Sequence, residues 1–358
     1  MSTEAVLNHH LEAFSAGDID AMMEDYTDDS VLIVPDVTLT GPARATTGIV
    51  TGIATGLVTA LLAACGGTGN GASPEAPGLP SGAPTAPVNM GPVINSGARD
   101  AEPTFTADGR TMYFNCFERQ GRTGSDICVS DLIDGAWAEP EIVEAVSTAE
   151  YLEVEPLLSP DGMQLYIMSN RPGGLGSTDI WVSERTEDGW SRPENLGAPI
   201  NSPSADHCLY FAGQNWDVAY WTSTRPGGYG GNDIWTSRRV DGVWQEAVNL
   251  GPDVNSAASE HHSLPSEDGK SLYVTSGRPD GYGGEDIYVT ARRDSGAWGP
   301  LVNLGPVVNS PAHDRCPAFS PDYGIFYFDS EREGGYGNKD LWWVPYSAVE
   351  AEVARAGR

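Results

Sequence analysis

Residues 153–202 read EVEPLLSPDGMQLYIMSNRPGGLGSTDIWVSERTEDGWSRPENLGAPINS, and close variants of this stretch occur five times along the chain. Each copy opens on an acidic residue, passes an S-P-D-G-like turn and a Gly-rich loop, and ends near a D-G-x-W turn. The opening acids are spaced by 53, 53, 54 and 54 residues. They are Asp100, Glu153, Asp206, Glu260 and Asp314. A period of about 54 residues held in register indicates a repeat architecture.

Each copy contains four short apolar stretches separated by turns. In the second copy we expect strands over residues 156–159, 165–169 and 180–184, and a fourth that begins at Trp190. Four antiparallel strands per repeat are the pattern of a propeller blade. The sequence therefore predicts an all-β fold, a five-bladed β-propeller over residues 87–346.

The two ends of the repeat region predict how the ring closes. The fifth copy stops after its third strand, at residues 341–346, while residues 87–94 match the fourth strand of a copy. We expect this N-terminal strand to complete the fifth blade, because ring closure removes the exposed sheet edges. Residues 347–358 are expected to form a short helical or frayed tail.

The repeat resembles the PD40, or WD40-like, family related to the TolB propeller, over nearly all of residues 87–346. The S-P-D-G turn, the S-x-R-P-G-G loop and the D-I-W triplet carry the resemblance. It implies a binding or scaffolding module of the bacterial envelope. Fold alone does not define function, so the site must carry the functional argument.

The N-terminal region has a different character. Residues 13–36, AFSAGDIDAMMEDYTDDSVLIVPD, resemble the opening of a SnoaL-like domain of the NTF2 superfamily. We expect a small α+β fragment over residues 1–47, with helices at 6–15 and 19–26 and a strand at 31–37. Only about the first third of that fold is represented, so the resemblance implies no ligand pocket and no function.

Residues 48–64 form an apolar segment without any charged side chain, followed by Cys65. The run L-A-A-C-G resembles a bacterial lipobox, which implies that Cys65 is lipidated and becomes the mature N-terminus. The segment length is typical of a signal h-region, although it lies far from the start of the chain. Two interpretations of this position stay open: the true start of the chain lies later, so that residues 1–47 come from a misassigned or fused gene start, or the segment is an internal signal anchor. A buried or disordered apolar stretch is the alternative to a signal. Residues 66–86 are rich in Gly, Ser, Ala and Pro and are expected to be a flexible linker.

The net charge of the chain limits the classes of partner that it can bind. The chain has 358 residues and a formal net charge of -30. Such a surface repels phosphate backbones and anionic lipids, so we expect no nucleic-acid partner, and membrane contact only through the lipid anchor or the apolar segment. The expected location is the bacterial cell envelope, as an outer-membrane or periplasmic lipoprotein.

Several repeated residues are predicted to hold the fold. In four copies an arginine precedes an aspartate by eight residues across the Gly-rich loop, and we expect these residues to pair. The pairs are Arg171/Asp179, Arg225/Asp233, Arg278/Asp286 and Arg332/Asp340. Repetition likewise favours packing over glycan stacking for the tryptophans. These are Trp137, Trp181, Trp190, Trp235, Trp244, Trp298 and Trp342.

Cysteine usage is sparse in the repeats. Cys116 and Cys128 fall on neighbouring strands of the first copy, so a disulfide can form in an oxidising compartment. Cys208 and Cys316 are expected to be buried thiols. The sequence holds no C-x-x-C and no zinc-ligand spacing.

The acidic residues that open the copies are expected to converge at one mouth of the propeller channel. One hypothesis is a Ca²⁺ ion bound by these carboxylates. The alternative is that each acid bonds the backbone of a neighbouring blade. The residues that follow them differ between copies, which predicts a binding pocket there. The candidate ligand-binding residues are Asp100, Glu153, Asp206, His207, Glu260, His261, His262, Asp314 and Arg315.

Two classes of function fit these observations. The leading interpretation is a non-catalytic binding or scaffolding propeller, with an envelope protein, peptide or glycan as ligand, no catalytic residue and no cofactor besides the hypothetical Ca²⁺. The alternative is a glycoside hydrolase that uses Asp206, Glu260 and Asp314. Carboxyl groups about 5 to 9 Å apart in an open pocket would favour the hydrolase. Carboxyl groups engaged by backbone N–H groups would argue against it.

Overall fold

The computed structural model describes residues 31–34, 37–40, 86–213 and 215–356. In the N-terminal unit it shows one antiparallel hairpin, β1 (Val31–Val34) with β2 (Val37–Thr40). The strand predicted over residues 31–37 therefore corresponds to β1 and the start of β2. The predicted helices at 6–15 and 19–26, the apolar segment and almost all of the linker lie outside the described residues. Within those described, no helix is long and apolar enough to cross a membrane.

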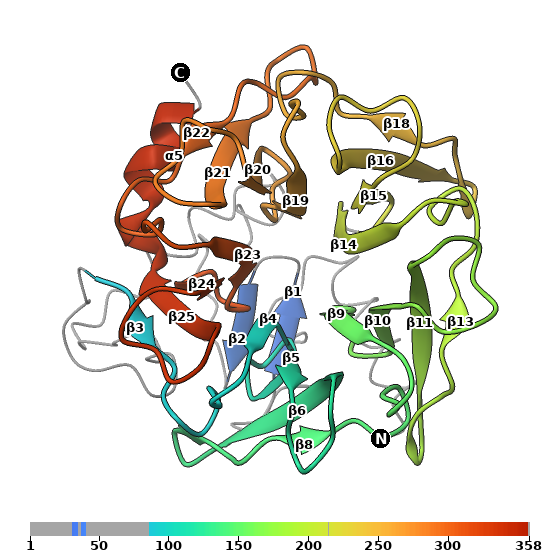
Figure 1. Ribbon diagram of the computed structural model, residues 1–358, viewed down its shortest axis with the longest axis vertical. Coiled ribbons are helices and arrows are strands. Elements are labelled where there is room, and N and C mark those ends of the chain that lie inside the picture. The colour runs from blue at the N-terminus through green and yellow to red at the C-terminus, as the bar shows by residue number, and fades with distance from the viewer. Residues whose placement is uncertain (1–30, 35–36, 41–85, 214, 357–358) are drawn as a thin grey trace, which may run out of the picture. The chain divides into compact units, whose positions relative to one another are not determined.

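Five antiparallel sheets form a ring of blades, which confirms the predicted five-bladed propeller (Figure 1). The innermost strands are β4 (Asp100–Phe105), β9 (Glu153–Leu158), β14 (Asp206–Ala212), β19 (Glu260–Pro265) and β23 (Asp314–Phe319). The second strands are β5 (Thr111–Phe117), β10 (Gln164–Ser169), β15 (Val218–Ser223), β20 (Ser271–Ser276) and β24 (Ile325–Ser330). The third strands are β6 (Ser125–Ile133), β11 (Asp179–Thr186), β16 (Asp233–Val240), β21 (Asp286–Ala291) and β25 (Asp340–Pro345).

The outer strand differs from the single strand that we expected to begin at Trp190. In the first three blades it consists of two short pieces. These are β7 (Ala136–Trp137) and β8 (Glu141–Ile142), β12 (Gly189–Trp190) and β13 (Glu194–Asn195), and β17 (Val243–Trp244) and β18 (Val248–Asn249). The fourth blade has β22 (Val302–Asn303). In the second blade the Ser183 hydroxyl donates to the Ser191 carbonyl at 2.5 Å, so a side chain bonds the backbone where the strand breaks.

The N-terminal strand closes the ring as predicted. Strand β3 (Val88–Asn89) pairs with β25, with Val88 opposite Trp343. The Asn95 side chain extends this contact, because its oxygen accepts from the Leu341 N–H at 2.8 Å and its amide donates to the Leu341 carbonyl at 3.0 Å. Asn201, Asn255 and Asn309 bracket the third strands of blades two to four in the same way. The repeated N-S dipeptide is therefore a fold element.

The core lies between neighbouring blades. One cluster combines Tyr113 and Ile127 of the first blade with Leu165 and Trp181 of the second. Among the repeat tryptophans, five are at most 9% exposed: Trp181, Trp190, Trp235, Trp298 and Trp342. This confirms packing as their role. Burial of aromatic side chains between blades is the main apolar contribution that joins each sheet to the next.

The C-terminal tail is helical. A short 3-10 helix, η2 (Tyr346–Ala348), leads into α5 (Glu350–Ala356), which lies beside the fourth blade (Figure 1). Val349 is fully buried in the cluster that joins blades four and five. The tail is therefore helical, one of the two predicted alternatives, and it packs on the outer side of the ring.

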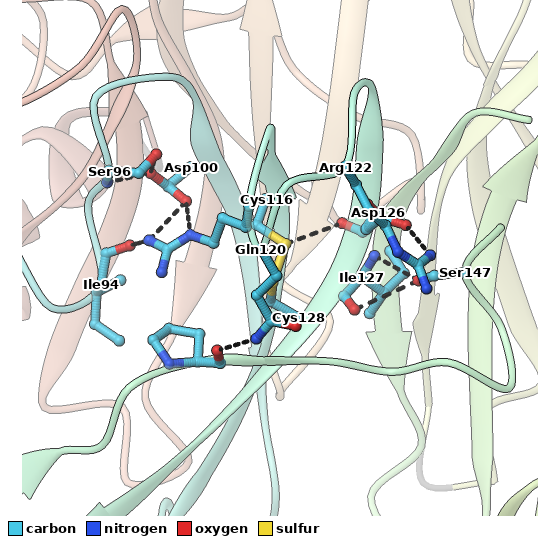
Figure 2. Close-up of a disulfide and its surroundings, with 12 residues drawn as sticks. Ile94, Ser96, Asp100, Cys116, Gln120, Arg122, Asp126, Ile127, Cys128 and Ser147 are labelled. Atoms are coloured by element: carbon cyan, nitrogen blue, oxygen red, sulfur yellow. Dashed lines mark hydrogen bonds and ion pairs between the residues drawn. A yellow bond between two sulfur atoms is a disulfide. The ribbon is translucent and has the colours of Figure 1, made fainter. Parts of the chain in front are cut away.

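A disulfide joins Cys116 on β5 to Cys128 on β6, as expected for the first blade (Figure 2). Both residues are almost fully buried. Cys208 and Cys316 are buried free thiols, which confirms the second cysteine prediction.

Candidate binding site in the central channel

The five acids that open the repeats lie inside the blade walls. Each has an exposed fraction of 0%. Asp206 shows the shared arrangement: it accepts from the Ser202 N–H at 2.6 Å, from the Ser202 hydroxyl at 2.7 Å and from Arg225 at 2.7 Å. The equivalent ion pairs are Arg119–Asp100, Arg171–Glu153, Arg278–Glu260 and Arg332–Asp314. Figure 2 shows Asp100 with its Ser96 partner.

The predicted pairing of Arg171, Arg225, Arg278 and Arg332 with the aspartates eight residues later is therefore wrong. The loop aspartates instead accept backbone N–H groups of their own loops; Asp179, for example, accepts from Leu175 at 2.7 Å and from Gly176 at 3.2 Å. The tight loop presents these N–H groups to the aspartate at close range. Each arginine reaches the buried acid at the start of its blade, where a charge without a partner would be costly.

The expected convergence of these acids at the channel mouth does not occur. Burial raises the pKa of Asp100 and Glu153, against the opposing effects of their arginine and hydroxyl partners. Because Asp206, Glu260 and Asp314 are fully buried and engaged by serines and arginines, they do not line an open pocket.

A second ring of residues, two positions after each acid, faces the channel instead. It consists of Glu102, Glu155, Cys208, His262 and Cys316, and we call it the channel ring. All five have left-handed backbones, with φ of 60°, 57°, 52°, 45° and 52°. Each innermost strand has a register irregularity at this point. A β-bulge changes the direction in which a side chain points. Here the five bulges lie where the innermost strands surround one cavity, and the channel-ring residues line it.

The channel ring is joined by short polar contacts. The Cys208 thiol donates to Glu155 Oε1 at 3.1 Å, and the Cys208 N–H also donates to that carboxylate. The Glu155 N–H donates to Glu102 Oε2 at 2.8 Å. His262 Nε2 lies 3.1 Å from Cys316 Sγ and 3.8 Å from Glu102 Oε1. The five repeats therefore bring two carboxylates, two thiols and an imidazole into contact.

The other predicted polar residues lie beside this ring. His207 Nδ1 is 3.1 Å from Cys208 Sγ, and its ring centroid is 5.7 Å from that of His261. His261 Nε2 is 3.4 Å from Glu285 Oε1, and Arg315 pairs with the other oxygen of Glu285. The structure thus brings His207, His261, His262 and Arg315 into one polar region, although apart from the five buried acids.

Burial and close contacts set the charges of this region. Burial alone would raise the pKa of Glu155, but the hydrogen bond from His207 and the charges of His207 and His262 lower it to about 2. The same contact raises the pKa of His207 despite its burial. Burial and the neighbouring imidazoles lower the pKa of His261 to about 3. Burial raises the pKa of the Cys208 and Cys316 thiols well above the usual value.

The channel ring forms the floor of a cavity of about 460 Å³. Residues two positions further along the innermost strands line its walls: Thr104, Leu157, Tyr210, Leu264 and Ala318. Aromatic side chains surround it nearer the S-P-D-G turns, among them Phe105, Phe211, Trp216, Phe319 and Tyr323. The cavity therefore combines a polar floor with aliphatic and aromatic walls.

Sequence reasoning missed four channel-ring residues, Glu102, Glu155, Cys208 and Cys316. The signal was present, because they occupy one register position at which the five copies differ in chemistry. What the spacing does not show is the bulge, which turns this position toward the channel while the preceding acid enters the wall.

Comparison with known proteins gives likeness of structure only. No family model matches the chain, and no curated protein matches it. An endo-arabinase from Bacteroides thetaiotaomicron is 15% identical with a TM-score of 0.48, over 72% of this chain and 97% of that one. A putative TolB from Agrobacterium tumefaciens is 18% identical with a TM-score of 0.43, over 68% and 76%. An alpha-L-arabinofuranosidase from Podospora anserina is 14% identical with a TM-score of 0.46, over 74% and 98%.

Proposed function

We propose that the chain is a non-catalytic binding propeller whose ligand enters the central channel. One observation carries this proposal. The residues that repeat in every blade are used by the fold, whereas the residues that line the cavity differ from blade to blade. A fivefold scaffold with a non-repeating channel lining presents one asymmetric site, as recognition of a specific ligand requires.

The lining favours a peptide or protein segment over a glycan. A cavity of about 460 Å³ is in the size range of ligand pockets, roughly 300–1,000 Å³. Its aliphatic walls at Leu157, Leu264 and Ala318 suit apolar side chains, and the Tyr210 phenol adds a polar group. Five of the repeat tryptophans, which could stack on sugar rings, are buried between blades, and Trp216 is the one tryptophan among the described residues that line the cavity.

The hydrolase alternative has less support. A glycosidase needs two carboxyl groups that reach the substrate from an open pocket. Asp206, Glu260 and Asp314 are fully buried, and each is hydrogen-bonded to a serine backbone N–H. We therefore assign them to the scaffold. The two carboxylates that do line the cavity, Glu102 and Glu155, were not part of that alternative, and they accept hydrogen bonds from the Glu155 N–H and from Cys208.

We further propose that the propeller is held in the bacterial envelope by lipidated Cys65. The lipobox-like run and the Gly/Ser/Ala/Pro-rich linker support this proposal. The Cys116–Cys128 disulfide is consistent with an oxidising compartment. Metabolic labelling with a fatty-acid analogue should tag the wild-type chain and leave Cys65→Ala unlabelled. Equal labelling of both chains would refute lipidation at this residue.

Blocking the cavity is expected to abolish peptide capture. Random peptides displayed on phage would be selected on the full chain, and the selected peptides would then be measured against Leu157→Arg. We expect binding to weaken by about tenfold or more, because a charged side chain then fills an apolar wall. Leu175→Arg is the matched control, because Leu175 is 51% exposed on a loop and should keep binding. Equal binding to both variants would place the ligand outside the channel.

A further inference from the structure

We propose that the channel ring binds one Zn²⁺ ion through Cys208, Cys316, His262 and one carboxylate, Glu155 or Glu102. The ion would lie at the floor of the cavity. The proposal concerns the same channel as the peptide site, but it requires no ligand there. It rests on the arrangement of sulfur, nitrogen and oxygen atoms.

The first argument is geometric. The ligand atoms of Glu155, Cys208 and His262 all lie within 4.8 Å of one another, and so do those of Glu102, His262 and Cys316. His262 belongs to both groups and joins them. Ligand atoms around a tetrahedral Zn²⁺ are about 3.3–3.8 Å apart, given metal–ligand bonds of about 2.0–2.3 Å. Cys208 also forms a group with His207 and His261, and no group of the described residues contains both cysteines. Binding of one ion by both thiolates therefore requires the Cys208 and Cys316 side chains to rotate toward a common position beside His262.

The second argument is chemical selectivity. Thiolate and imidazole are the ligands of zinc and related soft or borderline metals, whereas Ca²⁺ and Mg²⁺ select oxygen. A site with two sulfurs, one nitrogen and one carboxylate oxygen therefore favours Zn²⁺. This is a different place, and a different ion, from the Ca²⁺ hypothesis for the five buried acids.

The third argument is that the ligand groups are held by neighbours. Glu102 Oε2 accepts from the Glu155 N–H at 2.8 Å and from the Asn115 amide at 3.3 Å, which leaves Oε1 on the side of His262. The Cys208 N–H holds Glu155. Such second-layer hydrogen bonds orient metal ligands. The imidazole nitrogen that faces Cys316 and Glu102 is His262 Nε2, which is therefore the ligand atom on that side.

The fourth argument comes from the backbone. Left-handed conformations favour glycine or asparagine, yet all five channel-ring positions carry other side chains. Strained positions of this kind cluster at functional sites. Three of these five positions, Cys208, His262 and Cys316, carry side chains of the types that bind zinc.

Metal titration of the full chain tests the site. After dialysis against a chelator and its removal, Zn²⁺ binding would be measured by competition with a chromophoric chelator, without any peptide. We expect one ion per chain, and affinity about 100-fold weaker in the double variant Cys208→Ser/Cys316→Ser. Cys65→Ser is the matched cysteine control and should keep the wild-type stoichiometry. Unchanged zinc affinity in the double variant would overturn the proposal.

A second measurement uses the wild-type chain, so it tests the zinc site even if the double variant does not fold. Co²⁺ added to the wild-type chain should give the near-ultraviolet charge-transfer absorption of thiolate ligands, and Zn²⁺ but not Ca²⁺ should remove it. Co²⁺ binding without that absorption would exclude the two cysteines as ligands. Peptide capture would be run on metal-free and zinc-loaded chain, so failure of the zinc proposal and failure of the peptide proposal can be told apart.

Discussion

Replacing Asp206 with alanine is expected to lower the free energy of unfolding by about 3–5 kcal/mol. The side chain is fully buried, and its carboxylate is the charge partner of Arg225 at 2.7 Å. The variant leaves the Arg225 guanidinium largely buried without its counter-charge, and Ser202 without its acceptor. Urea denaturation followed by circular dichroism measures the difference.

Two comparisons make the Asp206 result specific. Asp253→Ala removes an acid that pairs with Arg293 at 3.0 Å on the exposed surface, and it should change stability by no more than about 0.5 kcal/mol. The apolar double variant Asp206→Leu/Arg225→Met should be more stable than Asp206→Ala, because no buried charge is left alone. A loss for Asp206→Ala as small as that for Asp253→Ala would contradict the scaffold role of the buried acids.

Removing the disulfide by Cys116→Ala/Cys128→Ala is expected to cost about 3 kcal/mol. The bond closes a loop between residues 12 apart in sequence, and it constrains the unfolded chain more than the folded blade. Urea denaturation of the oxidised chain and of the double variant gives the difference.

Reductant provides the control for the disulfide. The reduced wild-type chain should unfold near the midpoint of the double variant, and reductant should leave the double variant unchanged. Equal midpoints for the oxidised and reduced wild-type chains would show that this bond contributes nothing to stability.

The repeat was sufficient to predict the architecture. Five acidic residues at nearly equal spacing set the number of blades, and the match of residues 87–94 to a fourth strand predicted ring closure by β3. Turn residues and alternating apolar residues are local patterns, so they can be recognised from the sequence alone. The break in the outer strand was not predicted. At the break, the side chains of Ser130, Ser183 and Ser237 donate to backbone carbonyls of the outer strand, and residue spacing does not reveal such contacts.

The site was predicted only in part, for a physical reason. His207, His261, His262 and Arg315 stood out because they break the repeat, and the structure does bring them into one region. The acids at the start of each strand were expected in the channel, whereas the bulge after them turns Glu155 and Cys208 inward instead. A change of one residue in strand register moves a side chain to the opposite face.

The distribution of the candidate ligands over three blades explains why the sequence shows no zinc-ligand spacing. Zinc motifs in sequence are recognised when ligands are close along one segment. Cys208, His262 and Cys316 come from three different blades, about one repeat apart. The ring of blades places His262 in one group with Cys208 and in another with Cys316.

The central claim is that repeated residues hold the fold and that non-repeating channel residues hold the ligand. The most direct measurement is the affinity of a selected peptide for folded Tyr210→Ala and for folded Asp206→Asn, with the urea midpoint of each. We predict that folded Tyr210→Ala binds about tenfold or more weakly. Asp206→Asn should bind normally with a clearly lowered midpoint. Normal binding by Tyr210→Ala together with lost binding by folded Asp206→Asn would contradict the account.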